Sequence, residues 1–262
     1  MKKIKIIDII KKKGKQPIVC LTSYSKNISE ILDKYCDLVL VGDSMSMVLY
    51  GMKHTRDIKL DTMILHAKTV KKYTKKSLVV FDMPYKTYKN KNVAYKNAKK
   101  VINETKCDAI KLEGGKKIFD TIKYLTSKKI PVMGHIGLLP QKVNKFRLQG
   151  VNSKEKNKIF NDAISLSKSG AFAIVIECVV EELAKKITQS ISIPTIGIGA
   201  SKYCDGQILV TEDMIGLNNI SAKFVKKYSN IRKIIEMSVK MYRNDVKKRK
   251  FPSSQNIYNF NN

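Results

Sequence analysis

Eight short apolar segments, spaced along most of the chain, constrain its fold more than any other feature. Their hydrophobicity is continuous rather than alternating, which is typical of strands buried on both faces, as in parallel sheets. The segments are Ile18 to Thr22, Leu38 to Val41, Leu78 to Phe81, Ala109 to Leu112, Pro131 to Met133, Ala173 to Ile176, Pro194 to Ile198 and Gln207 to Val210.

Amphipathic stretches lie between most of these segments. They are Ile28 to Tyr35, Asp61 to Tyr73, Val93 to Thr105, Lys117 to Ser127, Lys154 to Ser169 and Val180 to Gln189. The link between the seventh and eighth segments is too short for a full helix, so that unit is expected to be irregular. Strand and helix in repeated alternation predict an α/β fold, a (β/α)8 TIM barrel, which typically needs about 250 residues. The 262 residues therefore suit one domain, 1–262.

Both ends of the chain are expected to add a small element to the barrel. Isoleucines recur at helical spacing near the start, which predicts an N-terminal helix over about residues 3–12. Asp8 interrupts this apolar stretch and no small-residue cleavage site follows, so a signal peptide is not favoured. Residues 229–242 predict a terminal helix, and a polar tail is expected from about residue 247.

The formal net charge of +29 comes from 51 Lys and Arg against 22 Asp and Glu. Such an excess has two readings: a nucleic-acid or anionic partner, or a lysine-rich surface. The second is favoured because basic pairs fall on polar helix faces and no nucleic-acid-binding motif accompanies them. No apolar run reaches the roughly 18 residues that a membrane span needs. Neither a nucleic-acid partner nor a membrane partner is therefore expected.

The cysteines indicate a reducing compartment. Their number is odd and no Cys-x-x-Cys pair occurs, so neither a disulfide framework nor a cysteine zinc site is expected. Two of them, Cys20 and Cys178, lie in apolar runs where a buried free thiol is the ordinary state. A cytoplasmic location follows.

Acidic side chains follow five of the predicted strands. In a barrel of this kind the active site forms at the carboxyl ends of the strands. Four carboxylates and one histidine are expected to converge there, namely Asp43, Asp82, Glu113, His135 and Glu177. Clustered buried carboxylates repel one another unless a cation holds them, which favours Mg2+ or a similar hard ion. The alternative is that these acids pair with lysines around the barrel rim.

Lys111 lies two residues before Glu113 in the same predicted strand, so both side chains are expected to point the same way. An inward lysine among acids is either a contact for a substrate anion or a salt bridge that balances the carboxylates, and both can hold. His135 is expected to hydrogen-bond substrate or water rather than to bind metal. His54 and His66 are interpreted as structural or surface residues.

Ordered motifs along residues 16–228 resemble those of the ketopantoate hydroxymethyltransferase family. They are Val41-Gly42-Asp43-Ser44, Phe81-Asp82-Met83-Pro84-Tyr85, Lys111-Leu112-Glu113-Gly114-Gly115, Met133-Gly134-His135-Ile136-Gly137-Leu138, Glu177-Cys178-Val179, Ile193-Pro194-Thr195-Ile196-Gly197-Ile198-Gly199-Ala200 and Asp205-Gly206-Gln207-Ile208-Leu209-Val210. The resemblance implies a barrel of the phosphoenolpyruvate/pyruvate-like type. It also implies hydroxymethyl transfer from 5,10-methylenetetrahydrofolate to 3-methyl-2-oxobutanoate, giving 2-dehydropantoate for pantothenate biosynthesis, by a homodecamer.

The same resemblance implies a role for each residue of the site. Asp43 and Asp82 are expected to bind Mg2+ directly and Glu113 through water, so that Asp43 and Asp82 also meet the chelated substrate. The oxo acid is expected to lie on Ser44 and Lys111, with His135 lining its pocket. Glu177 is expected to transfer the proton, either on the substrate or on the folate. The runner-up is another Mg2+-dependent oxo-acid lyase or aldolase on the same barrel.

This chain departs from the family pattern in three places. Val180 stands where a proline often follows the Glu-Cys-Val motif, and Ser25 stands where aspartate is usual. Glycine-containing residues usually found between Phe146 and Arg147 are absent. The segment 144–152, a candidate lid, is therefore expected to be short and to hold the folate less tightly.

Overall fold

The computed structural model describes residues 2–143, 146–219 and 222–258. The chain divides into two compact units, Met1–Thr211 and Glu212–Asn262, which are described separately. The expectation of one domain over residues 1–262 stays a prediction.

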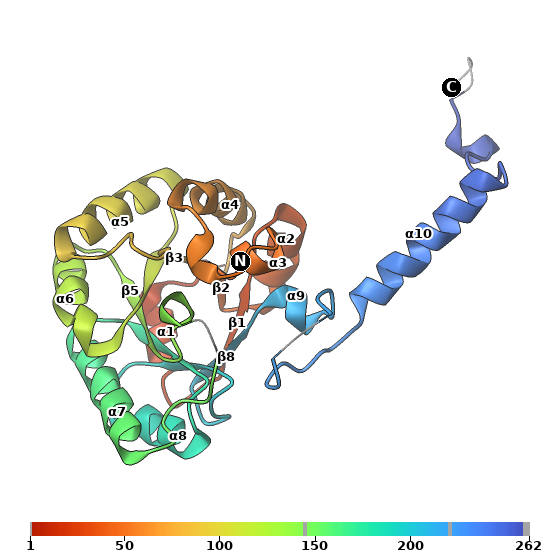
Figure 1. The fold of residues 1–262 in the computed structure, drawn as a ribbon. Coiled ribbons are helices and arrows are strands. Elements are labelled where there is room, and N and C mark those ends of the chain that lie inside the picture. The colour runs from red at the N-terminus through yellow and green to blue at the C-terminus, as the bar shows by residue number, and fades with distance from the viewer. Residues whose placement is uncertain (1, 144–145, 220–221, 259–262) are drawn as a thin grey trace. The chain divides into compact units, whose positions relative to one another are not determined.

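The first unit is a closed barrel of eight parallel strands, each paired with the next and the last with the first (Figure 1). This arrangement confirms the α/β barrel predicted from the apolar segments. The strands are β1 (Ile18–Thr22), β2 (Leu38–Val41), β3 (Leu78–Asp82), β4 (Ala109–Glu113), β5 (Val132–Gly137), β6 (Ala173–Glu177), β7 (Thr195–Ile198) and β8 (Gly206–Leu209).

Both faces of β2 to β7 are largely buried, which explains why their hydrophobicity is continuous, whereas β1 and β8 each have one exposed residue, Val19 and Gln207. In β2, Leu38 and Leu40 pack into a cluster inside the barrel, while Val39 and Val41 pack into a larger cluster beneath the helices. This period of two follows from the alternating direction of side chains along a strand. Ile9 of the N-terminal helix is fully buried in the inner cluster. That helix lies near the amino ends of the strands, because Ile4 N–H donates to the carbonyl of Lys76, just before β3.

The helices fall close to their predicted ranges. Those of the first unit are α1 (Ile6–Lys11), α2 (Lys26–Tyr35), α3 (Met45–Val48), α4 (Leu60–Tyr73), α5 (Lys91–Thr105), α6 (Phe119–Ser127), α7 (Ser153–Lys168) and α8 (Glu181–Ser190), with 3-10 turns η1 (Thr55–Asp57), η2 (Gly115–Ile118) and η3 (Pro140–Lys142). No helix joins β7 to β8, as the short link predicts. The asparagines Asn90 and Asn152 cap α5 and α7 by accepting N–H groups of the first turn at 2.9 Å.

Short α9 (Thr211–Met214) spans the boundary between the two units. The second unit contains α10 (Ile231–Lys247) and the 3-10 turn η4 (Ser254–Asn256). The terminal helix thus begins two residues later than predicted and ends where the polar tail was expected to begin. Within the described residues, no helix is both long enough and apolar enough to cross a membrane.

Candidate active site

The polar side chains singled out in the sequence face into the barrel at the carboxyl ends of its strands. In β4, Ala109 packs in the inner cluster, so alternation points Lys111 and Glu113 inward as well. The parallel register then places Asp82 beside Lys111 and Glu113 beside His135. The structure therefore brings these residues together at one mouth, as predicted from the sequence.

Lys111 forms a buried ion pair with Asp82. Its Nζ lies 2.8 Å from both carboxylate oxygens of Asp82 and 3.8 Å from Oε1 of Glu113. Burial alone would lower the pKa of Lys111, but Asp82, Glu113 and Asp43 outweigh it and raise that pKa above its ordinary value. Lys111 is therefore a permanent cation that balances part of the negative charge. Its contact with a substrate anion stays a prediction.

His135 connects two carboxylates across the mouth. Its Nδ1 lies 3.4 Å from Oε1 of Glu113, and its Nε2 lies 3.3 Å from Oε2 of Glu177. These separations exceed those of well-formed hydrogen bonds, and neither ring nitrogen has a hydrogen-bond partner among the described residues. Burial and Lys111 lower the pKa of His135, but Glu113 and Glu177 raise it to about 9. The ring is therefore positioned to carry a proton between the two acids.

Gln141 is a site residue that the sequence analysis missed. Its side chain is 1% exposed, and its Nε2 donates to Oδ2 of Asp43 at 2.8 Å and to the carbonyl of Met83 at 3.0 Å. Its Oε1 accepts a short hydrogen bond from the hydroxyl of Tyr88, and its backbone N–H donates to Oε2 of Glu113 at 3.2 Å. Gln141 thus joins two of the predicted metal ligands. The amide gives no sequence signal of this role, because it is neither charged nor a usual metal ligand.

Among the clustered carboxylates, Asp43 has the fewest nearby positively charged groups that offset its negative charge. Burial raises its pKa well above the ordinary value, and the neighbouring charges of Asp82 and Glu113 raise it further. Asp82 also has a raised pKa, caused first by burial and opposed by Lys111. A cation bound by Asp43, Asp82 and Glu113 would relieve this repulsion.

The donor chemistry of this carboxylate cluster, Asp43, Asp82 and Glu113, fits a hard divalent cation, because carboxylate oxygens are what Mg2+ prefers. As the side chains are placed, no group of three or more His, Cys, Asp or Glu in the described part of the chain is arranged to hold a metal ion. Both oxygens of Asp82 bind Lys111 instead. Each of these oxygens keeps a further lone pair, so a cation bound here would share the Asp82 carboxylate with Lys111.

Ser44 lies at the start of α3, directly after Asp43. Its hydroxyl lies 2.8 Å from that of Tyr24, which is buried after β1. The carbonyl of Tyr24 is 2.7 Å from Nδ1 of His66, whose Nε2 is 2.8 Å from the hydroxyl of Tyr50. His66 therefore has the structural role expected of it, since it holds the segment that positions Ser44.

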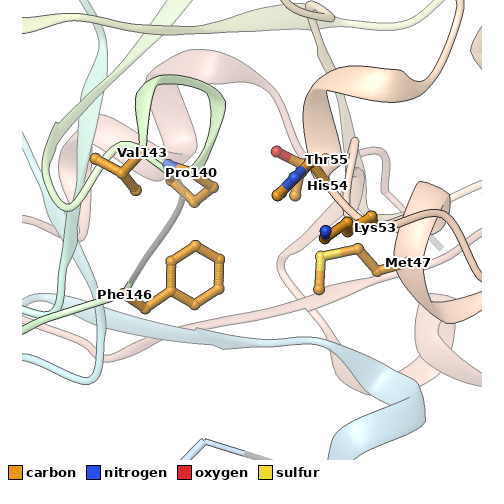
Figure 2. Close-up of a pocket in the computed structure, with 7 residues that line it drawn as sticks. All are labelled: Met47, Lys53, His54, Thr55, Pro140, Val143 and Phe146. Atoms are coloured by element: carbon orange, nitrogen blue, oxygen red, sulfur yellow. The ribbon is translucent and has the colours of Figure 1, made fainter.

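A cavity of about 230 Å³ opens beside this site (Figure 2). Segments near α3 and η1 provide one side, and the η3 turn with the residue Phe146 provides the other. The lining residues are Met47, Lys53, His54, Thr55, Pro140, Val143 and Phe146. His54 was interpreted as a structural or surface residue, and the structure adds that it lines this cavity.

The candidate lid begins at Asn144 and Lys145, which lie outside the described residues. Downstream, Gln149 is fixed by two backbone hydrogen bonds: its N–H donates to the carbonyl of Cys178 at 2.7 Å, and its carbonyl accepts from Val180 N–H at 3.1 Å. The candidate lid therefore has a fixed point at Gln149, beside β6. The expectation that it is shortened between Phe146 and Arg147 stays a prediction.

A closed β/α barrel that gathers buried carboxylates, a lysine and a histidine at the carboxyl ends of its strands defines a barrel enzyme with its active site at that mouth. The chain belongs to the ketopantoate hydroxymethyltransferase family, whose sequence pattern matches residues 3–254. It is 54% identical over 254 residues to the 3-methyl-2-oxobutanoate hydroxymethyltransferase of Pelagibacter ubique (strain HTCC1062), covering 97% of this chain and 99% of that protein. The protein of the same name from Rhizobium etli (strain ATCC 51251 / DSM 11541 / JCM 21823 / NBRC 15573 / CFN 42) is 49% identical over 251 residues, covering 94% and 92%.

Solved structures share the fold at low sequence identity. Phosphonopyruvate hydrolase in complex with oxalate and Mg++ superposes with a TM-score of 0.63 at 10% identity, covering 98% of this chain and 93% of that one. The 2,3-dimethylmalate lyase of the PEP mutase/isocitrate lyase superfamily gives 0.58 at 11% identity, covering 94% and 85%. These likenesses confirm the (β/α)8 barrel fold, while the family membership confirms that the chain is a hydroxymethyltransferase.

Proposed function

We propose that this enzyme transfers a hydroxymethyl group from 5,10-methylenetetrahydrofolate to 3-methyl-2-oxobutanoate, with Mg2+ as cofactor, giving 2-dehydropantoate and tetrahydrofolate. The observation that carries the proposal is the buried cluster of Asp43, Asp82 and Glu113 beside Lys111. A small oxo acid presents a carboxylate and a carbonyl, which suit a cation and a lysine held side by side.

In this proposal Asp43 and Asp82 hold the cation directly, and Glu113 holds it through water. Bound Mg2+ supplies a Lewis acid that polarises the substrate carbonyl and makes the proton on its C3 atom more acidic. Lys111 and the Ser44 hydroxyl bind the substrate carboxylate and carbonyl group, and they fix the acid in one orientation. The site residues are buried beneath the mouth of the barrel, and this burial keeps water away from the reacting carbon of the substrate.

Glu177 transfers the proton in this proposal. It ends β6, its side chain is 14% exposed, and Nε2 of His135 lies 3.3 Å from its Oε2. A carboxylate at the mouth is able to remove the C3 proton or to return a proton to the folate nitrogen. His135 orients this carboxylate and lines the substrate pocket. The imidazole also links Glu177 to Glu113 on the metal side.

The test is formation of 2-dehydropantoate from the two substrates by the purified enzyme, with Mg2+ and with EDTA. Product that depends on both methylenetetrahydrofolate and Mg2+ supports the proposal. Cleavage of an oxo acid without folate would instead support the lyase alternative, which the family match does not favour. Turnover unaffected by EDTA would contradict the metal assignment.

We also propose that the enzyme works as a cytoplasmic homodecamer, without nucleic-acid or membrane partners. Support for the compartment comes from five cysteines that are all free thiols. Light scattering coupled to size-exclusion chromatography tests the assembly, and a mass other than ten times 29.8 kDa contradicts it. Retention of the protein on DNA at physiological salt would contradict the absence of a nucleic-acid partner.

A further inference from the structure

The cavity in Figure 2 adjoins the carboxylate cluster through two segments of chain. Met47 lies three residues after Ser44 and its N–H donates to the Ser44 carbonyl at 3.0 Å. Pro140, on the other side, precedes Gln141, whose amide holds Asp43. The segments that line the cavity therefore also carry Ser44 and Gln141 of the site.

The walls of the cavity suit a flat aromatic group. Met47 and Phe146 are 40% and 57% exposed, so two large apolar side chains line it without being covered. Figure 2 shows Met47 on one side, with Pro140, Val143 and Phe146 across from it. Thioethers, prolines and aromatic rings all pack well against aromatic faces, and an aromatic guest would remove this apolar surface from water.

Thr55 provides an unpaired polar group in the same cavity. The residue is 5% exposed, and its hydroxyl has no hydrogen-bond partner within the described residues. A buried hydroxyl without a partner is costly, and such groups are uncommon in folded proteins. Its oxygen has less than 1 Å² of accessible surface, so a ligand with an N–H or carbonyl group at its edge would satisfy it once the threonine side chain rotates toward the cavity.

Lys53 adds a positive charge to the lining. Its side chain is exposed and forms no ion pair with the described carboxylates. The cavity therefore combines apolar walls, one unsatisfied hydroxyl and one free cation, which together match an aromatic heterocycle that carries an acidic extension. Its volume of about 230 Å³ is below the roughly 300–1,000 Å³ of sites that enclose a drug-sized ligand, so only part of such a molecule fits inside.

We propose that this cavity binds the pterin ring of the reduced folate donor. The ring lies between Met47 and Phe146, its amide edge meets the Thr55 hydroxyl, and Lys53 faces the carboxylates of the glutamate extension outside. This assignment rests on the proposed function, since it identifies where the donor of that reaction binds. It places the one-carbon unit next to the oxo acid held at Asp43 and Ser44.

Calorimetric titration with tetrahydrofolate and with 6-methyltetrahydropterin, which lacks the glutamate extension, tests the proposal. Phe146→Ala and Thr55→Val are expected to weaken both ligands about 3- to 10-fold, equivalent to a lost hydrogen bond or ring contact. Lys53→Ala is expected to weaken tetrahydrofolate about 3-fold or more while leaving the methylpterin within about 2-fold, because only the first carries carboxylates. Binding of the oxo acid should stay unchanged in all three variants.

Tyr35→Ala and Lys34→Ala on α2 are matched controls for loss of an exposed ring and an exposed charge, because neither lines the cavity. Thr55→Val keeps the side-chain shape, and circular dichroism verifies that each variant is folded.

If wild-type enzyme forms 2-dehydropantoate but Phe146→Ala and Thr55→Val bind both ligands normally, the cavity assignment is wrong and the proposed function stands. If the wild-type enzyme binds the pterin but forms no product, and the variants bind the pterin more weakly, the proposed function fails and the cavity assignment stands. If the wild-type enzyme binds neither tetrahydrofolate nor the methylpterin, both the proposed function and the cavity assignment are contradicted.

Discussion

The side-chain amide of Gln141 donates a hydrogen bond to Oδ2 of Asp43 across 98 residues of sequence, at 2.8 Å. The amide is itself fixed by the Met83 carbonyl and the Tyr88 hydroxyl, so it has little freedom to turn. This hydrogen bond holds Oδ2 of Asp43 in place and therefore restricts rotation of the carboxylate group. Such partners commonly orient metal-binding carboxylates.

Gln141→Leu is expected to weaken Mn2+ binding about 10- to 100-fold, because loss of an outer-shell partner typically has that effect. Mn2+ replaces Mg2+ here so that electron paramagnetic resonance can measure free metal without substrate or turnover. Tyr88→Phe leaves the amide in place and should produce a smaller loss. Equal Mn2+ affinity in wild type and Gln141→Leu would show that Asp43 needs no such support.

Asp43→Ala and Asp82→Ala should abolish metal-dependent turnover while the barrel stays folded. The loss of a direct ligand is expected to exceed the about 10- to 100-fold effect of losing an outer-shell partner. The product assay measures this, and far-ultraviolet circular dichroism reports the fold. Asp61→Ala, which removes an exposed carboxylate on α4 that forms an ion pair with Lys100, is the control and should retain activity. Full activity of either site variant in the presence of EDTA would remove the metal from the proposal.

Glu177→Gln should bind oxo acid and Mg2+ nearly as wild type but lose at least about tenfold in turnover, which is about 1.4 kcal/mol of barrier. The amide keeps the size of the side chain and cannot accept the proton. Calorimetry of oxo-acid binding beside steady-state rates separates the two effects. A large loss of affinity with unchanged turnover would assign Glu177 to binding instead.

Insertion of Gly-Gly-Tyr after Phe146 is expected to lower the Michaelis constant for methylenetetrahydrofolate and leave that for the oxo acid unchanged. The insertion lengthens the lid between η3 and the fixed Gln149, next to the cavity that Phe146 lines. Loops at the carboxyl ends of barrel strands often close over substrates. The oxo acid lies deeper and should not respond. If both constants stay the same, the lid interpretation is wrong for this chain.

The native thiols should react slowly with Ellman's reagent at pH 8. Burial raises the pKa of Cys36, Cys107 and Cys178 to about 11, and it also raises the pKa of Cys20 and Cys204. Because a free cysteine has a pKa of about 8.5, a thiol with a pKa of about 11 holds at least about a hundredfold less of the reactive thiolate at pH 8. All five thiols should react rapidly in guanidinium chloride. A fast-reacting thiol in the native enzyme would contradict this prediction.

The sequence predicts the barrel well because most strands, β2 to β7, are largely buried on both faces and the longer helices between them carry one apolar face. Strand ends were less well placed: β3, β4 and β6 each include the acidic residue that was expected to follow the strand, namely Asp82, Glu113 and Glu177. Apolar periodicity gives no signal for a strand whose last inward residue is a carboxylate. The register nevertheless follows from alternation alone, which is why Lys111 was correctly expected to share a face with Glu113.

Other parts of the site depend on partners that sequence spacing does not indicate. Gln141 meets Asp43 and Glu113 only because η3 follows β5 back over the mouth. His54 was interpreted as a structural or surface residue and Thr55 was not singled out, because their place beside Phe146 arises from two loops that follow separate strands. The ion pair of Lys111 with Asp82 shows that the lysine balances a carboxylate, while its contact with a substrate anion stays a prediction.

Main-chain contacts hold the end of β5, which carries His135, against the end of β6, which carries Glu177. Gly137 pairs with Glu177 in the sheet, and a Cβ added to Gly137 would come within 2.4 Å of the Glu177 carbonyl oxygen. Leu138 N–H donates to that same oxygen at 2.8 Å. The placement of the strand ends that carry His135 and Glu177 therefore depends on backbone packing and not on surface side chains. A chain with a formal net charge of +29 can exchange surface residues without altering this backbone contact.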